Sequence, residues 1–156
     1  MTHSELQQLL TEFAADRLAL LRRHEAGAMA VVNYDFNNTY QYVIAREDTH
    51  LSWLQSALAE YDAMLPSTAA LIPVPAARVV LDDDARHLGA FVDRWRPRVA
   101  ALTHARHRTM LNVVLGESLE HQRLFQQAAA GFENLLGRRT HGVARTGGVL
   151  PTRWVE

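Results

Sequence analysis

Two pairs of glutamate and histidine residues are the part of this 156-residue sequence best suited to chemistry. Glu47 and His50 form a Glu-x-x-His motif, while Glu117 and His121 stand four residues apart, with Glu120 directly before His121. Carboxylates together with imidazoles are ligands that proteins use for iron and manganese, and also for zinc. The two pairs therefore predict a metal site if the fold brings them together.

Both pairs interrupt a row of apolar residues that recurs at three- and four-residue steps, the spacing of one helix face. Burying a carboxylate without a partner costs several kcal/mol, so each interruption calls for a cation or a polar partner in the core. The apolar row around Glu47 and His50 is Tyr40, Val43, Leu54, Ala57, Leu58 and Tyr61. The row around Glu117 and His121 is Met110, Val113, Val114, Leu124 and Ala128.

Helical periodicity predicts four helices that position these pairs. Ser4 is the expected N-cap of the first helix, which ends at a turn over 33–38, and Asn37 or Asn38 is expected to cap the second, which runs to about Met64. A proline-punctuated apolar segment, 65–81, follows, and it is long for a link between helices.

The third helix is expected to begin at 82–84, where three Asp residues suit the positive end of a helix. Pro97 should kink or split it. The fourth helix is expected to start within 103–109 and to end at Gly137, a C-cap residue. We therefore predict an all-α domain over 1–137, followed by an extended tail, 138–156, whose apolar residues pack on the bundle or on a partner subunit.

Register along the helices adds a residue from the first helix. Glu25 and Glu47 each lie about eleven residues from the centre of the predicted turn, so they stand at the same height in an antiparallel pair. The expected ligands are Glu25, Glu47, His50, Glu117 and His121, with Glu120 as a further possibility. Asp93 has a suitable height on the third helix, but its neighbours place it on the outer face.

Composition excludes several classes of protein. The chain has no Cys, which excludes a disulfide scaffold, and no Lys, which excludes a Schiff-base or P-loop lysine. The net charge of −1 argues against a nucleic-acid partner. No apolar run approaches the length of a membrane span, and the first residues lack the order of a secretory signal. We expect a soluble, cytoplasmic protein.

These features together resemble the ferritin-like superfamily of carboxylate-bridged di-iron and di-manganese proteins. The resemblance covers about 4–137 and rests on Glu25, on Glu47 and His50, on the long segment between the second and third helices, and on Glu117 with His121. It implies a four-helix bundle with one long crossover, one or two iron or manganese ions, with zinc less favoured, and an oxidoreductase acting on dioxygen or peroxide.

The sequence departs from that pattern in two places. Its fourth helix has Glu-x-x-x-His, so Glu117 or Glu120 could be the ligand, and its third helix has no Glu. Two alternatives stay open. One is a DinB/YfiT-like mononuclear metal-dependent transferase, which His50, Glu117 and His121 would serve. The other is a metal-free interaction bundle in which the pairs form a buried polar network. The apolar tail suggests a homodimer, and nothing identifies a small-molecule substrate.

Overall fold

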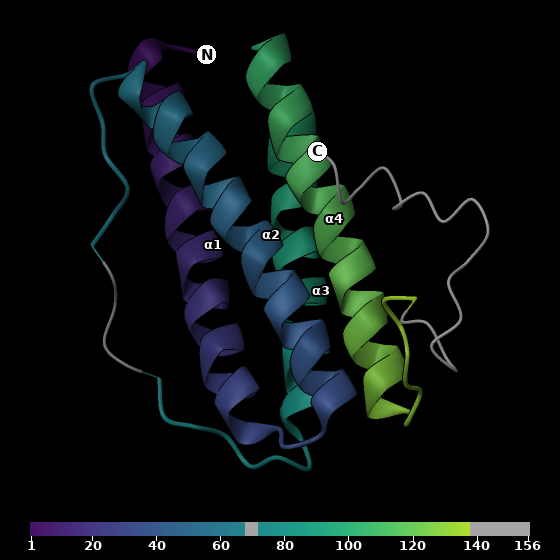
Figure 1. Cartoon of the computed structure of the whole chain (residues 1–156). Coiled ribbons are helices and arrows are strands. Elements are labelled where there is room, and N and C mark those ends of the chain that lie inside the picture. The colour runs from purple at the N-terminus through teal and green to yellow at the C-terminus, as the bar shows by residue number, and fades with distance from the viewer. Residues whose placement is uncertain (68–71, 138–156) are drawn as a thin grey trace, which may run out of the picture.

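The computed structural model describes residues 1–67 and 72–137, and these residues form four helices and no strand. The helices are α1 (His3–Ala30), α2 (Tyr34–Ala59), α3 (Val80–Ala100) and α4 (Ala105–Ala129) (Figure 1). For the described residues, the prediction of an all-α fold with four helices is confirmed. The predicted tail, 138–156, lies outside the described residues.

The first two helices begin at caps other than the predicted ones. Thr2 caps α1, and its side chain and that of Glu5 each accept a hydrogen bond from the other's backbone N–H, a capping box. Asn33 caps α2 by accepting from the Phe36 N–H, so the turn is shorter than predicted. Asn37 instead donates its side-chain amide to the Ala28 carbonyl and ties the two helices together.

The last two helices also differ from their predicted bounds. Pro97 lies in the final turn of α3, which continues to Ala100, so the helix is not split. The prediction that α4 reaches Gly137 is wrong. Gly131, with φ 93°, takes the left-handed conformation that follows a helix end, and α4 stops at Ala129.

Each helix packs against two others: α1 and α4 both contact α2 and α3. Contacts between α1 and α3 run antiparallel, since Glu12 pairs with Arg98 and Arg23 with Asp84. The hairpin of α1 and α2 is also antiparallel (Figure 1). It follows that α2 and α3 point the same way, and the segment between them starts at one end of the molecule and finishes at the other (Figure 1).

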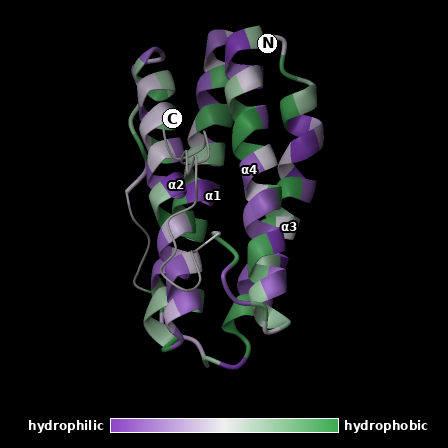
Figure 2. Cartoon of the chain, turned by 45° about the vertical axis from the view of Figure 1, so that its right-hand side comes forward, coloured by the Kyte–Doolittle hydropathy of each residue, from purple (hydrophilic) through white to green (hydrophobic). Residues whose placement is uncertain are grey.

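Every helix carries both hydrophobic and hydrophilic residues (Figure 2), and the hydrophobic residues meet in the centre. Phe13 packs edge-on against Phe91 and Trp95, with ring centroids 5.2 and 4.9 Å apart. The Trp95 indole N–H donates to Asp16 at 2.7 Å, which satisfies its polar atom. Among the described residues no helix is both long enough and apolar enough to span a membrane.

Candidate functional site

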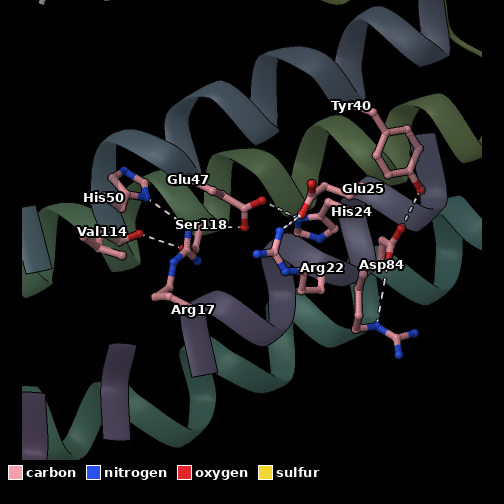
Figure 3. Close-up of polar contacts among 11 residues, drawn as sticks. Arg17, Arg22, His24, Glu25, Tyr40, Glu47, His50, Asp84, Val114 and Ser118 are labelled. Carbon is pink, nitrogen blue, oxygen red and sulfur yellow. Dashed lines mark hydrogen bonds and ion pairs between the residues drawn. The ribbon is translucent and has the colours of Figure 1, made fainter. Parts of the chain in front are cut away.

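Polar side chains from three helices are completely buried along about two helical turns of the bundle core, and Figure 3 shows several of them. This group, the core polar cluster, shows no exposed surface at any member. The remaining helix, α3, contributes Phe91, whose ring centroid lies 5.1 Å from the Arg17 guanidinium carbon. The members of the core polar cluster are Arg17 and His24 on α1, Glu47 and His50 on α2, and Ser118 and His121 on α4.

Arg17 is the hub of this cluster. Its Nη1 donates to Ser118 Oγ at 2.9 Å, and its Nη2 donates to His50 Nδ1 at 3.0 Å and lies 3.3 Å from Glu47 Oε2. Burial lowers the pKa of Arg17, while the Glu47 and Glu117 carboxylates oppose that effect. Because His50 Nδ1 accepts from Arg17, the proton of a neutral His50 ring is on Nε2.

Glu47 is held as an anion between two partners. His24 Nδ1 donates to its Oε1 at 2.6 Å, and Arg17 faces its Oε2. Burial by itself would raise the pKa of Glu47, but the attraction of His24 and Arg17 outweighs burial and leaves the pKa below its ordinary value. A fully buried carboxylate is stable here because both oxygens face cationic or donor groups.

Glu117 links the cluster to the surface. Its side chain is 21% exposed and accepts from Arg46 Nε at 2.7 Å and Arg46 Nη2 at 2.9 Å, a bidentate pair. His50 Nε2 lies 3.3 Å from Glu117 Oε2. Burial would raise the Glu117 pKa, but His50 and Arg46 lower it to about 2. Burial lowers the pKa of His50, and Glu117 only partly offsets this.

Several buried atoms of the cluster have no hydrogen-bond partner among the described residues. His121 has none at either ring nitrogen, and its pKa falls to about 3 because burial disfavours the imidazolium, so its ring is neutral. Such atoms are costly in a protein core unless water or an ion satisfies them. They are Arg17 Nε, His24 Nε2, Glu47 Oε2, His50 Nε2, and both nitrogens of His121.

The donor chemistry fits a transition metal, but the side-chain positions do not yet form a coordination sphere. In the described part of the chain no three His, Asp or Glu residues are grouped as a metal site. The His50 and His121 rings are 6.3 Å apart between centroids. Two imidazoles on one ion can reach about 6.4 Å, from metal–nitrogen bonds of about 2.1 Å, so they could share an ion only in a nearly linear arrangement.

The predicted residues divide into two groups. The structure brings Glu47, His50, Glu117 and His121 together on the facing sides of α2 and α4. It places Glu25 elsewhere: its side chain is 44% exposed and pairs with Arg22 on the same helix at 2.5 Å. Glu120 is partly exposed on α4, outside the core polar cluster.

Asp93 is exposed on α3, as its neighbours indicated. The core-facing acid of that helix is Asp84, which the sequence analysis missed. Its Oδ2 accepts from the Tyr40 hydroxyl at 2.5 Å, and Arg23 Nε is 3.8 Å from its Oδ1. Burial raises the pKa of Asp84, while His24 is the strongest influence that lowers it. Gly27 permits this approach, because a Cβ there would lie 2.7 Å from both Asp84 and Tyr40.

Arg17 was also missed as a member of the site, and His24, which its place beside Glu25 suggested to be a hydrogen-bonded residue, was not among the expected ligands, although a signal for both exists. Both stand in the apolar row of α1 at helical spacing, just as Glu47 and His50 stand in the row of α2. The apolar members of that row are Leu10, Phe13, Ala14, Leu20, Leu21 and Ala28, all buried.

The fold and site thus define a helical bundle with a charged, imidazole-rich core. Comparison of the chain with protein-family models, with curated proteins and with solved structures finds no match. The function must therefore be inferred from the site.

Proposed function

We propose that this protein is a ferritin-like four-helix bundle that binds a first-row transition metal, iron or manganese, in its core. The helix order supports the fold assignment. The antiparallel hairpins α1–α2 and α3–α4 pack so that α2 and α3 run parallel, an arrangement that is typical of bundles with one long crossover. A bundle of this class builds its metal sites from side chains on facing helices.

The observation that carries the metal is that four buried side chains of the core, His24, Glu47, His50 and His121, have potential metal-binding atoms without a hydrogen bond among the described residues. His50 and His121 are the imidazole ligands in this proposal, Glu47 is the buried carboxylate, and Glu117, 3.3 Å from His50 Nε2, is the carboxylate nearer the surface. Bound iron or manganese would supply redox chemistry toward dioxygen or peroxide.

The chain's own residues set the surroundings of that ion. Apolar side chains line this part of the core, among them Phe125, whose ring is 5.2 Å from that of His24. His24 orients Glu47 through its hydrogen bond, and Arg46 holds Glu117. Glu25 and Asp93, which could have served a second ion, lie at the surface. We therefore expect one ion per chain, a stoichiometry that a mononuclear transferase of the DinB/YfiT kind would share.

Metal content per chain tests the proposal. The protein is expressed with iron, manganese and zinc supplied, purified, and measured by elemental analysis. The double variant Glu47→Ala, His50→Ala should lose the ion, because it removes one carboxylate and one imidazole ligand. Glu25→Ala is the matched control and should keep the ion, since Glu25 contacts Arg22 at the surface. Full metal content in the double variant would overturn the proposed site.

One observation favours a second function, a metal-free interaction bundle. Arg17 already supplies a buried cation to Glu47, so the polar core is partly satisfied without an ion. In that case the melting temperature should not change on adding a chelator, whereas a metal-loaded protein should melt lower once the ion is removed.

Such a bundle, or a homodimer, would need a contact surface. Large apolar side chains are exposed at one end of the molecule, where α1 and α4 end and α2 and α3 begin (Figure 1). They are Met29, Val32, Tyr34, Val79 and Phe132. If this end forms a homodimer, Val32→Asp, at a fully exposed position, should convert the dimer to a monomer in size-exclusion chromatography with light scattering.

A further inference from the structure

Arg17 occupies the space between the groups that the proposed function assigns to the metal. Its guanidinium contacts Glu47 Oε2 at 3.3 Å and His50 Nδ1 at 3.0 Å, and it is anchored from the other side by Ser118. Ser118 is itself fixed, since its hydroxyl donates to the Val114 carbonyl at 2.7 Å. The Arg17 guanidinium is therefore held by contacts with all three other helices, and its central carbon lies over the Phe91 ring of α3.

The hydrogen bond between Arg17 and His50 is incompatible with a metal ion bound to His50 Nε2. An imidazole that binds a metal through Nε2 normally carries its proton on Nδ1 and donates it to an acceptor. In this structure His50 Nδ1 faces a guanidinium N–H, which is also a donor. If His50 binds an ion through Nε2, two donors would face each other, and the Arg17 guanidinium has to leave His50.

Charge points the same way. Arg17 and Arg46 balance the two carboxylates at this level, Glu47 and Glu117. A divalent ion added to this balanced set would leave excess positive charge in a buried site, where charge is costly. Without Arg17 the same ligands carry a net negative charge and suit a cation.

On the basis of the proposed function, we infer that Arg17 is an internal cation that competes with the metal for Glu47 and His50. The metal and the Arg17 guanidinium are alternative occupants of one position in the core. Metal affinity is therefore set by how firmly Ser118, Phe91 and Glu47 hold Arg17, and its removal strengthens metal binding.

Titration of metal-free protein with Mn²⁺, and separately with Zn²⁺, followed by calorimetry, tests this inference. Arg17→Met removes the charge at similar volume and should lower the dissociation constant at least tenfold. Arg17→Lys keeps a positive charge but cannot reproduce the forked contacts to Ser118 and His50, so its dissociation constant should lie between those of the wild type and Arg17→Met. Arg22→Met is the matched control. It removes a positive charge from the same helix, but at a partly exposed position where Arg22 forms an ion pair with Glu25.

Arg17→Met also leaves Glu47 with less compensation, so the metal-free variant is expected to be less stable than the wild type. Arg17→Gln keeps an amide that can donate to Ser118 and provides a second neutral variant if the first does not fold. In either neutral variant, the added ion should raise the melting temperature by more than it does in the wild type.

The outcomes separate the two hypotheses. Tighter binding by the neutral variants than by a wild type that also binds supports both the inference and the proposed function. Binding by the neutral variants alone supports the inference but overturns the proposed function for the native chain. Wild-type binding with equal or weaker binding by Arg17→Met overturns the inference and leaves the proposed function standing. No binding by any variant overturns the proposed function, and with it the role assigned to Arg17.

Discussion

Replacement of Glu47 by Gln should be among the most destabilising isosteric changes in this protein. The substitution keeps the shape of the side chain but removes its charge, and it leaves the Arg17 guanidinium buried without its carboxylate. At the observed separation of 3.3 Å, Coulomb's law with an effective dielectric constant of about 20 gives about 5 kcal/mol for the pair. Breaking a buried pair by removing one partner typically costs about 3–5 kcal/mol.

The free energy of unfolding, from urea or guanidinium titration followed by circular dichroism, measures this cost. All samples contain a chelator, so that only the ion pair is tested. The matched control is Glu12→Gln, which removes the same charge from the exposed Glu12–Arg98 pair and should cost no more than about 1 kcal/mol. Because a buried pair can often be replaced by apolar residues, Arg17→Met combined with Glu47→Leu should recover part of the lost stability. The rest is lost because the buried partners Ser118, His50 and His24 keep no hydrogen bond to this pair.

The reasoning would be refuted if Glu47→Gln costs as little as Glu12→Gln. That result would mean that the Arg17 charge is solvated or satisfied by other groups, and that the core polar cluster is not held together by this pair. A large cost that the double replacement does not recover would point instead to lost packing around Glu47.

Two further predictions concern stability. Acidification of metal-free protein should lower the free energy of unfolding between pH 6.5 and about pH 3, because the pKa of His121 is 6.5 in the unfolded chain but about 3 in the folded protein. Glu117, whose pKa falls from 4.5 to about 2 on folding, should lower it further between pH 4.5 and about pH 2. Urea titration across this range checks the trend, and His121→Gln should flatten its upper part. Gly27→Ala should lower the melting temperature, because its Cβ would meet Tyr40 at 2.7 Å, whereas Gly116→Ala, with nothing within 4 Å, should raise it slightly; an equal effect of the two substitutions would contradict the packing at Gly27.

The helices and half of the site could be predicted from the sequence, because apolar periodicity depends on local geometry. The rows that contain Glu47, His50 and His121 identify side chains that face the core, and the structure buries all three. The predicted helix ends were less accurate. Capping depends on single hydrogen bonds, such as the one that Asn33 accepts from the Phe36 N–H, and several Asn residues in that turn could have made one.

Glu25 shows what register cannot decide. Counting residues from a turn gives the height of a side chain along the helix, but it does not give the direction in which the side chain points. His24 and Glu25 have nearly the same height and differ by about 100° around the helix axis. That rotation places His24 against Glu47 in the core and Glu25 beside Arg22 at the surface.

Arg17 shows that a polar residue in an apolar row does not by itself indicate a metal site. A carboxylate such as Glu47 in the core requires a positive partner, but that partner can come from the chain as well as from a metal ion. Here the chain itself supplies a positive charge to Glu47 through Arg17, while His121 and the Nε2 of His50 lack hydrogen bonds. To predict a metal site from sequence, the sum of positive and negative charges in all core-facing rows is therefore more informative than the number of potential ligands. A core already balanced in charge should bind a metal only by displacing its own arginine.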